Sequence, residues 1–178
     1  ADTVSALYRG EIPVGPVVDA CRSAADSTEA RLVTALAARF DEDPSVVVTL
    51  LLQRVVLAPG DAIYLGPGNL HAYLHGVGVE VMGASDNVVR GGLTTKHVDV
   101  DELLRVLDPT PLRQPIVVPQ QPEPGHWCYD VPEDHLRAAD DRPPFRLWRL
   151  EVDVPFRHEA TSRQVLLCTG GDVGALSA

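Results

Sequence analysis

The sequence GPGNLHAYLHGVGVEVMGA, residues 66–84, decides how the middle of the chain is expected to fold. Glycine, proline and asparagine gather in it at 66–69 and 76–78, and these residue types favour turns. The short apolar runs beside the turns have the length and residue types of strands. We expect neighbouring antiparallel strands at 62–65, 71–75 and 79–84. Short strands at close spacing, divided by such turns, indicate a β-barrel or a β-sandwich.

The residues before this stretch change from a helical to a strand-like pattern. Apolar residues recur at helical spacing over 18–40, and Ser27-Thr28-Glu29 interrupts them and offers a cap for a second helix near Thr28. Proline and glycine at 10–16 predict a connector before the first helix. Beyond a break at 41–44, the β-branched run at 46–57 predicts one long strand or two short ones, followed by a turn at 58–61.

The residues after it predict one more helix and then extended chain. Residues 100–107 have the pattern of a short helix that Asp99 or Asp101 can cap. Six prolines between Pro109 and Pro124 predict an extended connector, because proline does not continue a helix. Apolar segments at 145–154 and 164–168 predict strands of a further sheet. The fold class that we expect is mostly β, with a helical segment at the N-terminus.

Composition excludes several classes of protein. The 178 residues are 45% hydrophobic and 22% charged, as in a soluble globular domain. A net charge of −10 opposes nonspecific binding to nucleic acid or to an anionic membrane. Cys21, Cys128 and Cys168 lie far apart, which excludes a cysteine metal knuckle or a dense disulfide scaffold. We expect reduced thiols and a cytoplasmic location.

Alternation along the predicted strand at 71–75 gives a candidate metal site. Residues two apart share a face of a strand, so His71, Tyr73 and His75 line one face. A neutral imidazole on a rigid strand is a good ligand for zinc or iron, although single histidines are more often ordinary surface or core residues. A two-residue loop at 76–77 pairs Tyr73 with Glu80 on the His71 face, whereas a three-residue loop puts Glu80 on the opposite face. We prefer the first register, with His71, Tyr73 and Glu80 pointing into a barrel lumen.

A second candidate site follows at 85–96. Ser85-Asp86-Asn87 favours a turn, and Gly91-Gly92 allows the backbone an unusual φ or a close approach to a ligand. Arg90 can bind a phosphate or stabilise an oxyanion, and Lys96 adds a second cation nearby in sequence. The alternative is an ordinary surface arginine and lysine around a loop.

Taken together, GPGNLHAYL at 66–74, Glu80-Val81-Met82 and SDNVVRGGLTTK at 85–96 strongly resemble the type I phosphomannose isomerases, zinc enzymes of the cupin superfamily. The resemblance is clear over 45–108 and weak before and after. It implies a cupin-type jelly-roll β-barrel. In chain order, the implied domains are the end of a helical domain at 1–40, a barrel portion with the active-site motif at 41–108, a proline-rich connector at 109–125 and further, truncated barrel strands at 126–178.

The resemblance also implies roles for single residues. His71 matches the motif histidine that binds Zn²⁺, and Arg90 matches the active-site arginine. Tyr73, Glu80 and Lys96 match positions that line the substrate pocket. His75 has no counterpart in the family, Thr95 stands where a proline is usual, and Gly91 stands where an alanine is usual.

One departure from the family is large. The other zinc ligands come from upstream segments, a Gln-x-His pair and a glutamate near an Asn-His-Lys-Pro-Glu run. This chain has no histidine before His71, and its only earlier glutamine is Gln53. The resemblance therefore implies an internal piece of the enzyme that lacks three ligands, so we expect this chain alone to bind zinc weakly and to be nearly inactive.

The implied reaction interconverts mannose 6-phosphate and fructose 6-phosphate, in carbohydrate metabolism that leads to GDP-mannose. A proton moves between C2 and C1 through an enediol(ate), with zinc polarising an oxygen and Arg90 meeting the negative charge. The expected partner is a small sugar phosphate, with no nucleic acid and no membrane. The alternative is a non-catalytic cupin-like domain that binds sugars or regulates, and that kept part of the motif.

Overall fold

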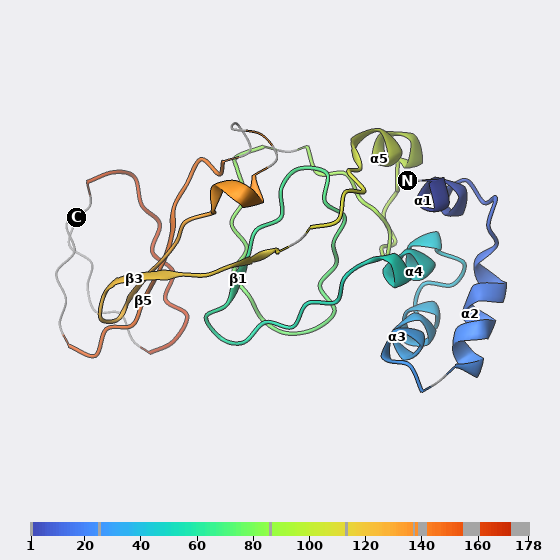
Figure 1. Ribbon diagram of the computed structural model, residues 1–178, viewed down its shortest axis with the longest axis horizontal. Coiled ribbons are helices and arrows are strands. Elements are labelled where there is room, and N and C mark those ends of the chain that lie inside the picture. Colours follow the sequence, from blue (N-terminus) through green and yellow to red (C-terminus); the bar gives the residue numbers. More distant parts are fainter. Residues whose placement is uncertain are drawn as a thin grey trace.

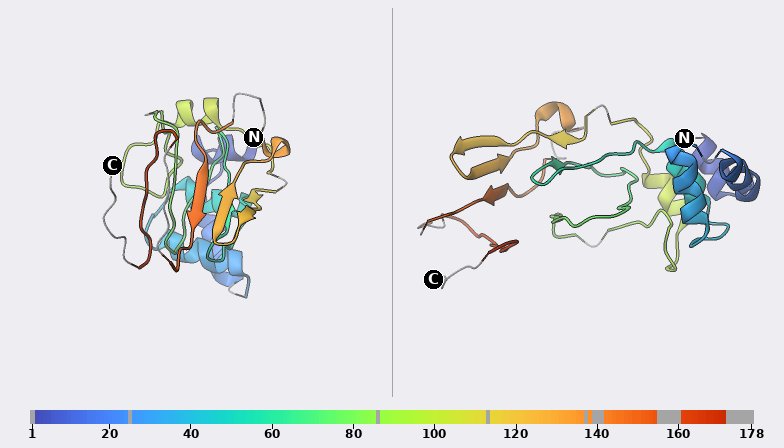
Figure 2. Two further views of the ribbon diagram at one scale, coloured as in Figure 1. Left: turned by 90° about the vertical axis from the view of Figure 1, so that its left-hand side faces the viewer. Right: turned by 90° about the horizontal axis from the view of Figure 1, so that it is seen from below.

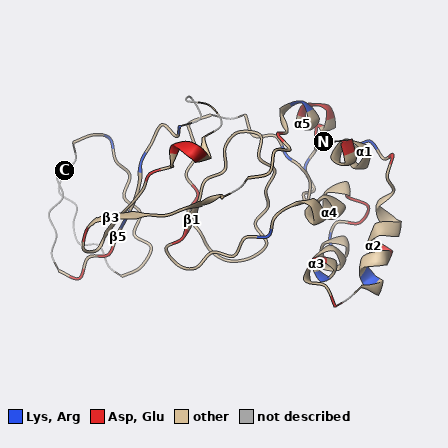
Figure 3. Ribbon diagram, viewed as in Figure 1, with Lys and Arg blue, Asp and Glu red and all other residues tan. Residues whose placement is uncertain are grey.

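Helices gather at one end of the molecule and extended chain occupies the other (Figure 1). This computed structural model describes residues 2–24, 26–85, 87–112, 114–136, 138, 142–154 and 161–171. The two further views show the same separation (Figure 2). Figure 3 shows acidic and basic positions side by side on the last helix, where Arg105 pairs with Glu102 at 2.5 Å. No described helix is long and apolar enough to cross a bilayer.

The helical end consists of five helices and a short 3₁₀ turn. Their bounds are α1 (Asp2–Tyr8), α2 (Val14–Ser23), α3 (Thr28–Ala37), α4 (Pro44–Val48), η1 (Thr49–Leu51) and α5 (Val100–Val106). Side-chain caps begin three of them: Ser27 accepts from Ala30 N at 3.2 Å, and Asp99 accepts from Glu102 N at 3.0 Å. Asp43 caps α4 in the same way. The predicted pair of helices divided at residue 27, and the helix at 100–107 with Asp99 as its cap, are confirmed.

Two hydrophobic clusters hold the helical end together, and α4 belongs to both. Val47 and Val48 pack with α1 and α5, through residues such as Leu7 and Leu103. Val46 packs on the other side with α2 and α3. Val46 and Val48 are 0% and 1% exposed, so α4 forms the centre of the core.

The prediction of strands at 46–57 is wrong, because α4 and η1 occupy 44–51. Pro44 stands at the first helical position, where its fixed φ suits a helix, and Asp43 caps it. Burial between the two clusters then outweighs the β-propensity of three consecutive valines, since strand propensity depends strongly on context. The connector predicted at 10–16 is also shorter than expected. Helix α2 begins at Val14, and Pro16 fits its first turn, where proline costs no hydrogen bond.

The extended end holds two small antiparallel sheets. In one, β1 (Ala62–Ile63) pairs with β2 (Ile116–Val117). The other has the order β3-β4-β5, with bounds β3 (Gln120–Glu123), β4 (His126–Tyr129) and β5 (Leu147–Leu150). A 3₁₀ turn, η2 (Glu133–His135), follows β4.

Part of the predicted proline-rich connector is therefore strand. Pro122 lies within β3, which is the edge strand of its sheet, the place where a missing N–H does least harm to the ladder. The strand predicted at 145–154 is confirmed in part as β5. Residues 164–168 form no strand.

The strands predicted at 71–75 and 79–84 are not formed, and β1 pairs with 116–117 instead. The turn before them is present, with Asn69 N donating to Gly66 O at 3.3 Å. Residues 71–82 are exposed throughout, so no second layer covers them. Without a neighbouring strand to take their hydrogen bonds, these segments stay extended but unpaired, and the described residues build no closed barrel.

Candidate functional site

His71 follows directly on the turn at 66–69, and that turn orients its ring. The Nδ1 atom of His71 lies 3.1 Å from the carbonyl oxygen of Asn69. Because a carbonyl oxygen only accepts, Nδ1 carries the proton in this contact. A neutral imidazole in this tautomer presents the lone pair of Nε2 outward. This is the arrangement of a metal-ligating histidine whose other ring nitrogen donates to the backbone.

Tyr73 lies beside His71, and Glu80 lies near Tyr73. The rings of His71 and Tyr73 meet edge to face, with centroids 5.9 Å apart and planes at 71°. Partial burial of Tyr73 and the nearby Glu80 carboxylate raise the pKa of the Tyr73 hydroxyl. Tyr73 and Glu80 therefore lie near each other, although the strands whose register was predicted to pair them are not formed.

The surroundings of this group differ from the prediction. Tyr73 is 72% exposed, and His71 and Glu80 are exposed as well. They lie on the surface of the described chain, and the prediction that they line a barrel lumen is wrong for these residues. His75 is also exposed.

Arg90 and Lys96 belong to the second half of the motif, at 85–96, and both are exposed. No described carboxylate forms an ion pair with Arg90, so its guanidinium is open to an anion. Ser85 donates to Asn87 Oδ1 at 2.9 Å, a local bond of the expected turn. Asp86, the middle residue of that turn, lies outside the described residues.

The two halves of the motif meet on one hydrophobic cluster. Leu70, which precedes His71, and Val89, which precedes Arg90, both pack against the cluster of α1, α4 and α5. Leu70 also contacts the turn after Arg90 so closely that a Cβ on Gly91 would overlap its Cδ1 atom. Two segments 20 residues apart in sequence are therefore neighbours in space.

The described residues do not complete a zinc centre. A catalytic zinc has three protein ligands and an open position. Among the residues that the structure describes, no group of three or more histidine, cysteine, aspartate or glutamate side chains comes together. His71 offers one suitable nitrogen, Nε2.

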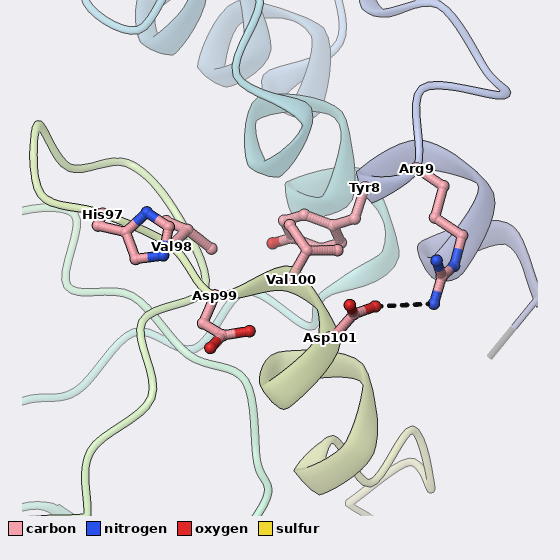
Figure 4. A pocket seen from close by; sticks show the side chains of 7 residues that line it. All are labelled: Tyr8, Arg9, His97, Val98, Asp99, Val100 and Asp101. Atoms are coloured by element: carbon pink, nitrogen blue, oxygen red, sulfur yellow. Dashed lines mark hydrogen bonds and ion pairs between the residues drawn. The ribbon is translucent and has the colours of Figure 1, made fainter.

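A hollow of the described surface lies next to the end of the motif. A shallow cavity of about 500 Å³ opens between α1 and α5, and its lining comprises Tyr8, Arg9, His97, Val98, Asp99, Val100 and Asp101. Figure 4 shows Arg9 reaching across it to Asp101, at 3.2 Å. None of the five predicted site residues lines it.

Comparison with known proteins gives partial but consistent matches. The chain is 43% identical over 112 residues to a probable mannose-6-phosphate isomerase of Dictyostelium discoideum, which covers 61% of the chain and 25% of that protein. It is 49% identical over 65 residues to mannose-6-phosphate isomerase of Escherichia coli, covering 36% of the chain and 17% of that protein. It is 35% identical over 125 residues to the enzyme of Rattus norvegicus, covering 68% of the chain and 27% of that protein.

No protein-family model matches the chain, and no solved structure is detectably similar to it. The relatives and the motif agree that the chain is similar to part of the sugar-phosphate isomerases. These relatives carry the name of mannose-6-phosphate isomerase, the family that the sequence resembles. The chain spans about a quarter or less of the length of these relatives.

Proposed function

We propose that the protein containing this chain interconverts mannose 6-phosphate and fructose 6-phosphate, and that residues 66–96 supply part of its active site. The observation that carries the proposal is that Leu70 and Val89, which directly precede His71 and Arg90, pack against one hydrophobic cluster and so bring the two halves of the motif together. Relatives that bear the name of this enzyme support it.

In this proposal Arg90 is the catalytic residue of the chain. Moving a proton between C2 and C1 puts negative charge on a substrate oxygen, and a preorganised guanidinium lowers the energy of that state. Arg90 suits the task because no described carboxylate neutralises it. Tyr73, Glu80 and Lys96 contact the sugar phosphate, Lys96 as a second cation.

Zn²⁺ is the proposed cofactor, with the Nε2 atom of His71 as one ligand. The metal supplies a Lewis acid when it is bound. Since the described residues bring no three ligands together, the remaining ligands come from other parts of the longer protein. The contact between His71 Nδ1 and Asn69 O supports this role, because it leaves Nε2 free to bind.

A cupin-type barrel is the proposed setting of the site. Large apolar side chains stand exposed along the motif, among them Val77, Val79, Val81 and Met82. Such a run of exposed apolar residues marks a surface that another part of a protein covers. We place the protein in the cytoplasm, since Cys21, Cys128 and Cys168 all carry free thiols.

A non-catalytic sugar-binding domain is the second candidate, favoured by the incomplete ligand set of the described residues.

The test is isomerase activity of the full-length protein that includes these residues. We expect fructose 6-phosphate to form from mannose 6-phosphate, activity to disappear after chelation and zinc to restore it. Binding of mannose 6-phosphate without turnover, in a protein saturated with zinc, would establish the second candidate instead.

A further inference from the structure

The turn that follows Arg90 is attached to the helical end through a long-range contact. Leu93 N donates to Asp43 Oδ2 at 2.9 Å and to Ser45 Oγ at 3.0 Å, although 50 and 48 residues separate them. Asp43 caps α4, so the turn is fastened to the helix that lies in both hydrophobic clusters.

Asp43 uses its two carboxylate oxygens for two different tasks. Oδ1 accepts from Ser45 N at 2.9 Å and from Ser45 Oγ at 2.6 Å, which caps α4. Oδ2 accepts from Leu93 N and so reaches the turn. Ser45 is only 7% exposed, which shields this small network from water.

The residues between Arg90 and Leu93 are held from two further sides. Tyr8, at the end of α1, donates from its hydroxyl to the carbonyl oxygen of Gly91. Burial, with a contribution from the Asp43 charge, raises the pKa of Tyr8 to about 12, so this hydroxyl keeps its proton at neutral pH. Gly92 adopts φ +131°, and a Cβ there would stand 2.5 Å from Ser45 Cβ and 2.9 Å from Asp43 Oδ1. These contacts together restrict the main-chain conformation of residues 91–93.

We propose that Asp43 is a positioning residue for Arg90: by binding Leu93 N it fixes the main chain of the Gly91–Leu93 turn and so aims the Arg90 guanidinium. This inference rests on the proposed function. Arg90 itself is exposed and makes no ion pair with a described carboxylate, so the backbone beside it sets its direction. Catalytic groups must be held within a fraction of an ångström of their working geometry, and misplacement by about 1 Å costs on the order of 100-fold in rate.

Asp43→Asn in the full-length protein tests the idea with little change in shape. Asparagine caps helices as well as aspartate does, so α4 keeps its cap, but its amide nitrogen cannot accept from Leu93 N. We expect roughly a tenfold fall in kcat with KM nearly unchanged, and faster hydrogen exchange at the Leu93 amide. The matched control is Asp99→Asn, which alters the cap of α5 and leaves the turn alone. It should preserve kcat and the exchange rate at Leu93.

A double-mutant cycle separates this role from a general loss of stability. In an Arg90→Ala background, Asp43→Asn should lower kcat no further, because the group that it positions is gone. A full additional loss in that background would overturn the inference. So would unchanged kcat or unchanged Leu93 exchange in Asp43→Asn itself.

Failure of the inference and failure of the proposed function give different results. If Arg90→Ala impairs turnover while Asp43→Asn does not, only the positioning role is wrong. If the wild-type protein has no isomerase activity, the proposed function falls, and the positioning role with it.

Should Asp43→Asn fail to fold, Tyr8→Phe takes its place. It removes the hydroxyl that holds Gly91 O and keeps the ring, and it should lower kcat with KM nearly unchanged. An unchanged kcat would overturn the inference there.

Discussion

Gly92→Ala should lower the free energy of unfolding of the helical end far more than a Gly→Ala substitution at another position with a similar positive φ. At φ +131° an L-residue pays a backbone strain of about 1–3 kcal/mol. The new methyl also meets Ser45 Cβ at 2.5 Å and Asp43 Oδ1 at 2.9 Å. Neither neighbour can withdraw, since Ser45 is buried and its hydroxyl and backbone N are both bound to Asp43. Overpacking of this kind costs a further ~1–3 kcal/mol.

The matched control is Gly76→Ala. Gly76 has φ +118°, and a Cβ there meets nothing within 4 Å, so it reports the backbone cost without the collision. Urea denaturation followed by circular dichroism at 222 nm measures the loss of the helices. We expect Gly92→Ala to lower the free energy of unfolding by about 1–3 kcal/mol more than Gly76→Ala. Equal losses in the two variants would refute the close packing of Gly92 on Asp43 and Ser45.

Three further predictions follow from the site and the core. Arg90→Ala in the full-length protein should lower kcat by ~10²–10³ with zinc content unchanged, whereas His71→Ala should remove both metal and activity; a rise in KM alone would make Arg90 a phosphate-binding residue instead. The 178-residue chain by itself should bind zinc weakly and turn over little mannose 6-phosphate, which zinc analysis after dialysis and a turnover assay measure, and tight one-to-one zinc with normal turnover would contradict it. Because the pKa of Tyr8 is raised from 10.0 to about 12, the stability that its protonated form contributes should be complete below pH 10 and decline between pH 10 and 12. Tyr8→Phe should abolish that part of the decline in denaturation experiments across this range.

The helices could be predicted where their signals are local. Ser27 and Asp99 stand directly before apolar residues at helical spacing, and both cap as expected. The valines of α4 led to the wrong prediction of strands at 46–57. Their β-propensity is visible in the sequence, whereas their burial in two clusters is not. Asp43 and Pro44 are the local signal that a helix begins at residue 44. The sequence analysis interpreted them only as part of a break at 41–44.

The site shows the same division between local and long-range information. The motif residues were accessible from spacing and residue type, whereas the strands whose register was predicted to pair Tyr73 with Glu80 are not formed. The attachment of the Arg90 turn was not, because Tyr8 and Asp43 lie 83 and 50 residues away from the atoms that they bind. The sequence signal for this attachment was the glycine pair Gly91-Gly92. At Gly92 the freedom from a Cβ serves a neighbouring side chain of this chain rather than a ligand.

Pro122 in β3 has a consequence for how this sheet meets other molecules. The outer edge of β3 offers a proline without an N–H, a glutamate at residue 123 and side chains that are all exposed. Proline and charge on an edge strand discourage pairing with a foreign strand. Within the described residues β5 forms the opposite edge, and it carries Trp148, 46% exposed. Among the described residues, β3 is therefore the edge less suited to pair with another strand, and we expect a strand that joins this sheet to do so beside β5.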